Sequence, residues 1–560
     1  MKQHYLPMVR ATEKYLSDLL SRVNTDPRDF YRGGIADTRY ITEPPNTPSL
    51  VNVICTLYVC PESRYFRDER LLARLETACD MMERVMHEDG TWDFLATNYY
   101  TPATFEIQAL ARAYRCLMGG STGTPAEKAV LGRLYHVLER LGEGCLNGGF
   151  HTPNHRWVES ASLLMLSNIC GRSDFAEKAE RYLAEGIDCD EYGEFTERSM
   201  GCYNAVNVNS LMIMAEEGNK PELYEYVKKT LDLSFSYLDW DGSLFTKNSR
   251  RQDADNERFY PAATWHYLYL WAGYLFGNRK YLRFARDMME DNIAAGRGVP
   301  GCLWLYETFP ALKELDTDLT DVTIESSYTR FFPKSGILRL RRERFTATLI
   351  AGKPDFLYLK FGNKELTLRM CASFFAVAQF EPERIEKTGS GYSMYFKGHG
   401  EYKGQFAQPP ATSDWYKMDH AARPVLHSCD LEFLLDLTPL EDGFDLHIRV
   451  FNTPRVPFKL EFCIPEGTRL ETNNFISDVT AGGSMVIKSG NIRLTDVGSG
   501  ASVTVKGLFA THLYHTNMRG SIPGKPGCFA LCATNTSPID RTLAFRFSEQ
   551  TRAPRMDDEI

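Results

Sequence analysis

The first polar segment of this 560-residue chain whose residue types suit acid–base chemistry covers residues 148–159. It holds His151, Asn154, His155 and Arg156 beside two glycines and a proline. A loop fixed by glycine and proline before a helix directs side chains and backbone amides toward an anion. Helix capping is the other interpretation, since Asn is a good N-cap. Capping does not require the adjacent histidines and arginine, which favour a functional role.

A second polar segment, residues 190–204, follows the same pattern of a glycine, an aromatic residue and then a helix. It contains Glu197, Arg198 and Tyr203. A third segment begins at Asn248. Its candidate site residues are Arg250, Arg251, Arg258, Tyr260 and, six residues further on, His266.

Glycine followed closely by an aromatic or apolar residue recurs through the first half of the chain, at successive glycines 44 to 59 residues apart. Apolar residues between these glycines show helical periodicity, for example over residues 65–87 and 126–141. Repeats of this length are typical of solenoids and closed arrays of helix pairs. We therefore expect an N-terminal (α/α) toroid of five or six helical hairpins, with an irregular helical solenoid as the alternative.

The pattern changes near residues 316–329, after which apolar residues alternate with polar ones. Residues 336–341 and 444–451 are examples, and Gly, Pro and Asn separate such runs. No helical crossovers intervene, so the pattern predicts a C-terminal antiparallel β-sandwich. The fold class is thus multidomain α+β, with a toroid over residues 1–320 and a sandwich over residues 321–560.

Equivalent loops of successive hairpins in a toroid lie around one rim, so the three polar segments are expected to converge there. Together the three segments supply Asn, His, Tyr and Arg. These types suit removal of the proton alpha to a uronate carboxylate, because amide, imidazole and guanidinium donors neutralise the carboxylate and stabilise the enolate-like intermediate. Tyr or His can transfer the protons. The predicted product is a C4=C5 unsaturated uronide.

Several short motifs resemble those of the polysaccharide lyases of the heparinase II/III, alginate lyase and chondroitin/hyaluronate lyase group. The Asn154-His155 pair is similar to the pair that opens the catalytic helix in that group. The segment that runs from Asp190 to Tyr203 resembles the one that carries the family tyrosine, and residues 331–341 resemble the first strand of the β-domain. The resemblance implies a toroid joined to a β-sandwich.

The resemblance also implies residue roles. Asn154 neutralises the substrate carboxylate, with His155 as base or co-ligand. Tyr203 donates a proton to the leaving oxygen and, for some substrates, also abstracts the C5 proton. Arg250 and Arg251 are similar to arginines that hold the uronate. The predicted catalytic residues are thus Asn154, His155, Tyr203 and Arg251, and the predicted substrate contacts are His151, Arg156, Trp92, Tyr99, Glu197, Arg198, Arg250, Arg258, Tyr260 and His266.

Two other functions stay open. An inverting (α/α) glycoside hydrolase needs two separated carboxyl groups. Candidate acids are Asp89, Asp93, Glu106, Glu159, Glu197 and Asp241. A non-catalytic carbohydrate-binding protein would instead stack sugars on aromatic rings. The aromatic candidates are Trp92, Tyr99, Tyr100, Trp157 and Trp240.

Composition limits the partners and the location. Lys and Arg total 64 against 73 Asp and Glu, a net charge of −9, which disfavours nucleic acid and anionic membranes as partners. No secretory signal or long apolar run is visible, and the 14 cysteines are sparse, so we expect a cytoplasmic protein. An acidic oligosaccharide or polysaccharide is the expected partner, and the sequence leaves the oligomeric state open.

We expect no cofactor and no metal ligands. Zinc in the β-domain is a less favoured alternative, because the candidate residues lack a recognised zinc spacing. These candidates are Asp419, His420, His427 and His447.

Overall fold

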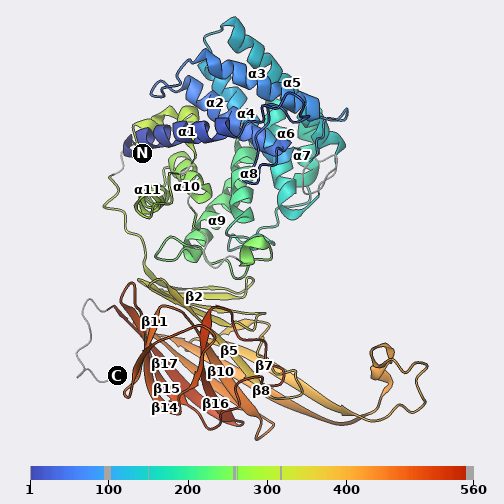
Figure 1. Ribbon diagram of the computed structural model, residues 1–560, viewed down its shortest axis with the longest axis vertical. Helices are drawn as coiled ribbons and strands as arrows, with labels where there is room; N and C mark the ends of the chain where they lie inside the picture. The colour runs from blue at the N-terminus through green and yellow to red at the C-terminus, as the bar shows by residue number, and fades with distance from the viewer. Residues whose placement is uncertain are drawn as a thin grey trace. The chain divides into compact units, whose positions relative to one another are not determined.

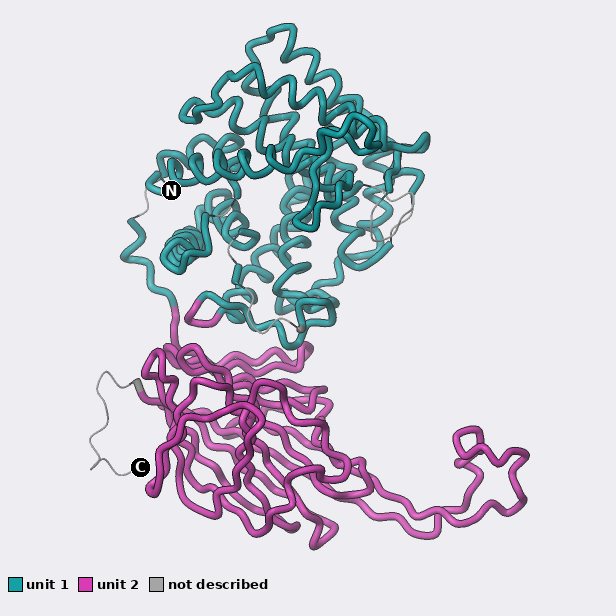
Figure 2. Tube along the Cα trace, in the orientation of Figure 1, with its two compact units in different colours: residues 1–238, 242–324 teal, residues 239–241, 325–560 magenta. Residues whose placement is uncertain are grey.

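The computed structural model describes residues 2–93, 103–148, 151–255, 260–261, 263–299, 301–315 and 318–549. The chain forms two compact units (Figure 2). Unit 1 comprises residues 1–238 and 242–324, and unit 2 comprises residues 239–241 and 325–560. The main division lies at Ile324, four residues after the boundary expected from composition.

Unit 1 is helical (Figure 1). Its helices are α1 (Lys2–Ser21), α2 (Thr47–Val59), α3 (Glu69–Val85), α4 (Thr104–Gly120), α5 (Pro125–Asn147), α6 (Pro153–Cys170), α7 (Ser173–Leu183), α8 (Tyr203–Glu217), α9 (Tyr224–Tyr237), α10 (Thr264–Leu275), α11 (Arg279–Ala294) and α12 (Leu303–Thr308).

Five helical hairpins run from α2/α3 to α10/α11 in the described part of unit 1. The first helix of each hairpin contacts the first helix of the next, in the order α2, α4, α6, α8 and α10. Helix α12 packs on α1, α2 and α4, which brings the two ends of the series together. The first helices therefore form an inner ring and the second helices an outer one, which confirms the expected toroid.

The glycine-aromatic loops have a common geometry. Gly90, Gly193 and Gly242 have φ values of +86°, +93° and +79°, which favour glycine. A Cβ atom on Gly193 would lie 2.4 Å from the backbone of Lys229, so the close approach also requires glycine. Isolated bridges such as Cys189 to Phe195 close these loops. The repeated sequence signal thus marks repeated turns that lead to the inner helices.

Unit 2 is a β-sandwich. Its strands are β1 (Ser327–Phe332), β2 (Ile337–Arg342), β3 (Phe345–Ile350), β4 (Leu357–Phe361), β5 (Lys364–Ala372), β6 (Ile385–Lys387), β7 (Tyr392–Lys403), β8 (Val425–Pro439), β9 (Gly443–Phe451), β10 (Pro457–Pro465), β11 (Thr468–Glu471), β12 (Ile476–Asp478), β13 (Ser484–Val486), β14 (Ser489–Asp496), β15 (Ala501–Phe509), β16 (Cys528–Thr536) and β17 (Ile539–Glu549).

The strands form two sheets, with orders β1-β2-β3-β4-β5-β10-β16-β13 and β12-β11-β14-β15-β17-β9-β8-β7-β6. Their pairings are antiparallel except for β13 with β16, which are parallel. Alternating residues such as Phe433, Leu446 and Ile448 of one sheet and Leu460 and Phe462 of the other share one core. The expected sandwich is therefore confirmed. Within the described ranges, no helix has the length and apolar character needed to cross a membrane.

Candidate active site

Asn154 is a buried amide that holds a carboxylate. It is the second residue of α6, and its Nδ2 atom lies 3.0 Å from both carboxylate oxygens of Glu197, which precedes α8. The N-cap of α6 is Thr152, so the capping interpretation of Asn154 is wrong. The amide instead joins the first and second polar segments, as expected for loops on one rim.

Arg251 and Gln252 bring the third segment to the same place. Arg251 lies 3.4 Å from the Glu197 carboxylate, and its guanidinium carbon lies 4.7 Å from the centre of the Tyr203 ring. The Tyr203 hydroxyl accepts a hydrogen bond from Gln252 Nε2 at 2.8 Å and a longer one from Arg251 at 3.5 Å. Two donors therefore point at the phenol oxygen of the first residue of α8 and can stabilise negative charge there.

His155 is a half-buried neighbour of this cluster. Its Nδ1 atom lies 2.7 Å from the Thr152 hydroxyl, and its ring packs edge to face on Phe105 at 5.1 Å. Burial, and then the positive charge of Arg251, lower the pKa of His155 to about 4. The imidazole is therefore neutral near pH 7.

Asp253 fixes the loops that carry Arg251 and Tyr203. Its buried carboxylate accepts hydrogen bonds from the Ser199 hydroxyl at 2.9 Å, from the Gly201 amide at 3.0 Å and from the Ser249 hydroxyl. It thereby ties the arginine-bearing loop to the start of α8.

Glu194 is a third buried carboxylate, after Glu197 and Asp253. It accepts hydrogen bonds from Asn204 Nδ2 at 2.7 Å and from the Tyr237 hydroxyl at 2.8 Å. Burial raises the pKa of Glu194 to about 7. Sequence reasoning assigned no role to Gln252, Asp253 or Glu194, although all three lie within the polar segments that it singled out.

The other predicted contacts have varied surroundings. His151 and Arg156 both pair with Glu185, at 2.9 and 3.0 Å. Arg250 lies next to the cluster, where its backbone N–H donates to the Glu197 carbonyl at 3.1 Å. Burial, and then the charge of the nearby Arg250, lower the pKa of Arg198. The guanidinium carbon of Arg297 lies 4.1 Å from the centre of the Tyr260 ring. Predicted contacts Tyr99 and Arg258 lie outside the described residues, as does Tyr100.

Trp92 and His266 are corrections to the predicted sugar contacts. Each is only 1% exposed, because each packs into the helical core of unit 1. His266 Nδ1 lies 2.8 Å from the Ala285 carbonyl. Trp157 is also buried and donates its indole N–H to Asp188 at 2.8 Å. These rings offer no face to a sugar.

The His266 imidazole predicts a pH dependence of stability. Burial lowers its pKa from 6.5 to about 4, so on acidification the unfolded chain takes up a proton before the folded chain does. The resulting stability is fully present above pH 6.5 and is lost as the pH falls toward 4. Between pH 7 and pH 5 we expect this group to remove about 2 kcal/mol. Denaturant unfolding measures the free energy of unfolding at the two pH values. Between pH 7 and pH 5, His266→Gln should lose about 2 kcal/mol less of this free energy than the wild type does. The exposed control His427→Gln should lose as much as the wild type.

Most acids considered for a hydrolase have close partners. Glu159 pairs with Lys178 at 2.8 Å and Asp93 with His87 at 2.9 Å. Asp89 accepts a hydrogen bond from the Thr91 hydroxyl at 2.7 Å, and Asp241, which belongs to unit 2, pairs with Lys360 at 2.8 Å. For Glu106 the notable property is its pKa, which burial raises to about 7.

Among the residues that the structure describes, no three His, Cys, Asp or Glu side chains come together as a metal site requires. The histidines considered for zinc contact different groups: His420 the Trp415 carbonyl at 2.8 Å, His427 the Tyr402 ring at 6.5 Å, and His447 the Asp540 carboxylate at 2.7 Å.

No family model and no curated protein matches the sequence. Solved structures do match the fold. The heparan sulfate lyase HepC of Pedobacter heparinus aligns with a TM-score of 0.52 at 10% identity, over 98% of this chain and 84% of its own. A Paenibacillus xanthan lyase aligns at 0.55 and 11%, over 97% and 55%. The Streptomyces coelicolor A3 chondroitin AC lyase aligns at 0.51 and 11%, over 97% and 77%.

These matches show that the chain shares its fold, a helical toroid and a β-sandwich, with these three lyases. The resemblance found in the sequence motifs is therefore confirmed at the level of the fold.

Proposed function

We propose that this protein is a polysaccharide lyase that cleaves uronic-acid-containing glycans by β-elimination. The supporting observation is the pair Asn154 and Arg251, which holds the Glu197 carboxylate next to the Tyr203 hydroxyl. A uronate substrate needs the same combination of carboxylate donors beside a proton-transfer group. Solved structures that share the fold include lyases of heparan sulfate, xanthan and chondroitin.

In the proposed reaction the substrate carboxylate shares the donors of Asn154 and Arg251 with Glu197. A base removes the C5 proton, and the electron pair of that bond forms the C4=C5 double bond. The C4–O bond breaks, its electrons leave with the glycosidic oxygen, and the Tyr203 hydroxyl protonates that oxygen. The base is either Tyr203, whose ring contacts Arg251, or the neutral His155, on which the charge of Arg251 acts.

The experiment that tests this function is incubation with glucuronan, alginate, hyaluronan, chondroitin and heparan oligomers, followed by ultraviolet absorbance. A lyase produces the absorbance of the unsaturated uronide. A hydrolase yields reducing ends without that absorbance, and a binding protein yields neither, so either result would contradict the proposal.

The same site predicts a dependence on substrate charge. Carboxyl-reduced or esterified oligosaccharides lose the anionic partner of Asn154 and Arg251, and charge-assisted hydrogen bonds are about twice as strong as neutral ones. We expect poor binding and poor turnover of these substrates when new reducing ends are measured in parallel with the acidic oligosaccharide. Equal activity on the neutral glycans would redirect attention to acids such as Glu106.

Replacing Glu197 is expected to change KM for an acidic substrate. It presents a negative charge where the substrate carboxylate arrives, and burial raises its pKa while Asn154 and Arg251 oppose that shift. Glu197→Gln keeps an oxygen for Asn154 but removes the repulsion. We expect KM for an acidic oligosaccharide to fall about fivefold, which corresponds to ~1 kcal/mol. An unchanged or higher KM would show that Glu197 does not share the anion site.

A further inference from the structure

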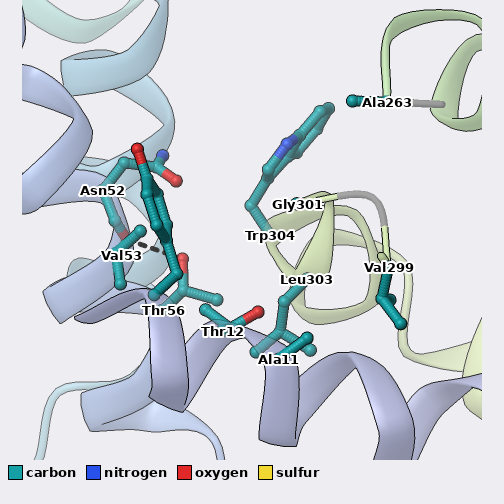
Figure 3. Close-up of a pocket in the computed structure, with 11 residues that line it drawn as sticks. Ala11, Thr12, Asn52, Val53, Thr56, Ala263, Val299, Gly301, Leu303 and Trp304 are labelled. Carbon is teal, nitrogen blue, oxygen red and sulfur yellow. Dashed lines mark hydrogen bonds between the residues drawn. The ribbon is translucent and has the colours of Figure 1, made fainter. Parts of the chain in front are cut away.

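Unit 1 contains a cavity of about 380 Å³ that none of the assigned site residues lines. Figure 3 shows Trp304 beside Ala263 on one side of it, and Asn52, Val53 and Thr56 of α2 on the other. The described residues that line it also include Ala11, Thr12 and Tyr15 of α1 and Val299, Gly301 and Leu303. None of these described lining residues carries a charge.

The Trp304 indole is held in place from behind. The Arg112 guanidinium lies 4.0 Å from the indole ring, and the rings of Tyr267 and Trp271 meet it edge to face at 5.8 and 6.0 Å. Arg112 is itself fixed by a 2.7 Å hydrogen bond to Asn209 of α8. Since these partners are not part of the lining, the rest of the indole borders the cavity as a preformed aromatic surface.

The polar groups of the cavity are hydroxyl and amide groups that are already oriented. Thr12 and Thr56 each donate their hydroxyl hydrogen to a helix carbonyl, at 2.8 Å, which leaves their oxygens as acceptors. Asn52 donates its Nδ2 to the Ala109 carbonyl at 3.1 Å. Tyr15, which is 43% exposed, adds a second aromatic ring with a polar tip. Sugar hydroxyls can donate to such acceptors while ring C–H groups cover an aromatic face.

The cavity and the catalytic cluster both lie against inner helices of unit 1, the cavity along α2 and the cluster at α6 and α8. Asn154 and Tyr203 lie in the first turns of α6 and α8. Trp304 lies in the first turn of α12, and Ala263 directly precedes α10. Because an outer helix runs back after each inner one, successive inner helices begin at the same end.

We propose that this cavity binds an uncharged sugar ring of the glycan, a neutral hexose or N-acetylhexosamine without sulfate. This inference rests on the proposed lyase function and specifies its substrate as a chain that combines a uronate with a neutral sugar. A sulfate or carboxylate here would lose hydration without gaining a charged partner from the lining, which costs free energy.

Two variants test the cavity directly, without lyase activity. Saturation-transfer NMR is recorded with the methyl β-glycoside of N-acetylglucosamine and with its 6-sulfate, for the wild type, Trp304→Ala, Tyr15→Ala and the control Tyr40→Ala. Tyr40 is 90% exposed and does not line the cavity. We expect transfer to the neutral glycoside in the wild type and the control, at least a threefold loss in both cavity variants, and none to the sulfate.

Equal transfer to all four proteins, transfer to the sulfate as strong as to the neutral glycoside, or no transfer at all would overturn the inference. Tyr15→Ala keeps the test valid should Trp304→Ala misfold, because Tyr15 is largely exposed.

With an active lyase, the cavity variants should raise KM about 10-fold for oligosaccharides that reach the cavity, with kcat within twofold. Unsaturated product without any transfer to the wild type refutes the cavity, whereas absence of unsaturated product alone refutes the lyase.

Discussion

Tyr203→Phe is expected to lower kcat by at least ~100-fold on an acidic oligosaccharide while the fold is retained. The substitution removes one hydroxyl, which accepts hydrogen bonds from Gln252 and Arg251 and is the proposed acid for the leaving oxygen. Without it, the glycosidic oxygen leaves as an unprotonated alkoxide. Initial rates by ultraviolet absorbance measure the change, and circular dichroism checks the fold.

Tyr226→Phe is the matched control, because Tyr226 lies on the outer helix α9, away from the cluster. It removes the same atom and should leave kcat within twofold. Near-normal turnover of Tyr203→Phe would remove Tyr203 from the mechanism and leave His155 as the remaining proton-transfer group.

Local sequence signals predicted the fold well because each has a local cause. A glycine such as Gly193 is required by its own φ and by a backbone approach, so its pattern recurs wherever the turn recurs. Alternation in residues 444–451 follows directly from the two faces of a strand. The order of strands β5, β10 and β16 has no such local signal, since strands far apart in the sequence pair there.

Part of the candidate site could also be predicted, because the polar segments belong to the same repeated turns. Convergence of the polar segments follows from the repeat, but the contacts between them do not. Asn154 meets Glu197 across 43 residues, and Ser199 meets Asp253 across 54. Residue type alone also cannot separate a site residue from a core residue. His266 has the chemistry of a catalytic group, yet it packs beneath α11 against a carbonyl.

Asn154→Ala is expected to lower kcat by ~10²–10³-fold with a smaller change in KM. As the C5 proton departs, electron density grows on the substrate carboxylate, so an amide donor fixed beside it binds the transition state more strongly than the ground state. The contact with Glu197 fixes that amide. Rates at saturating and at low substrate separate kcat from KM.

A double variant distinguishes catalysis by Asn154 from mere support of the loop. Asn154→Asp alone sets two buried carboxylates against each other, so it is expected to be unstable as well as inactive. In Asn154→Asp/Glu197→Gln the amide and the carboxylate exchange places, which restores the hydrogen bond with donor and acceptor reversed. If Asn154 only supports the loop, this exchange should recover both stability and turnover. If it acts on the substrate carboxylate, stability should return while kcat stays at least ~100-fold low, because the carboxyl group that replaces the Asn154 amide has no N–H to donate to the uronate carboxylate.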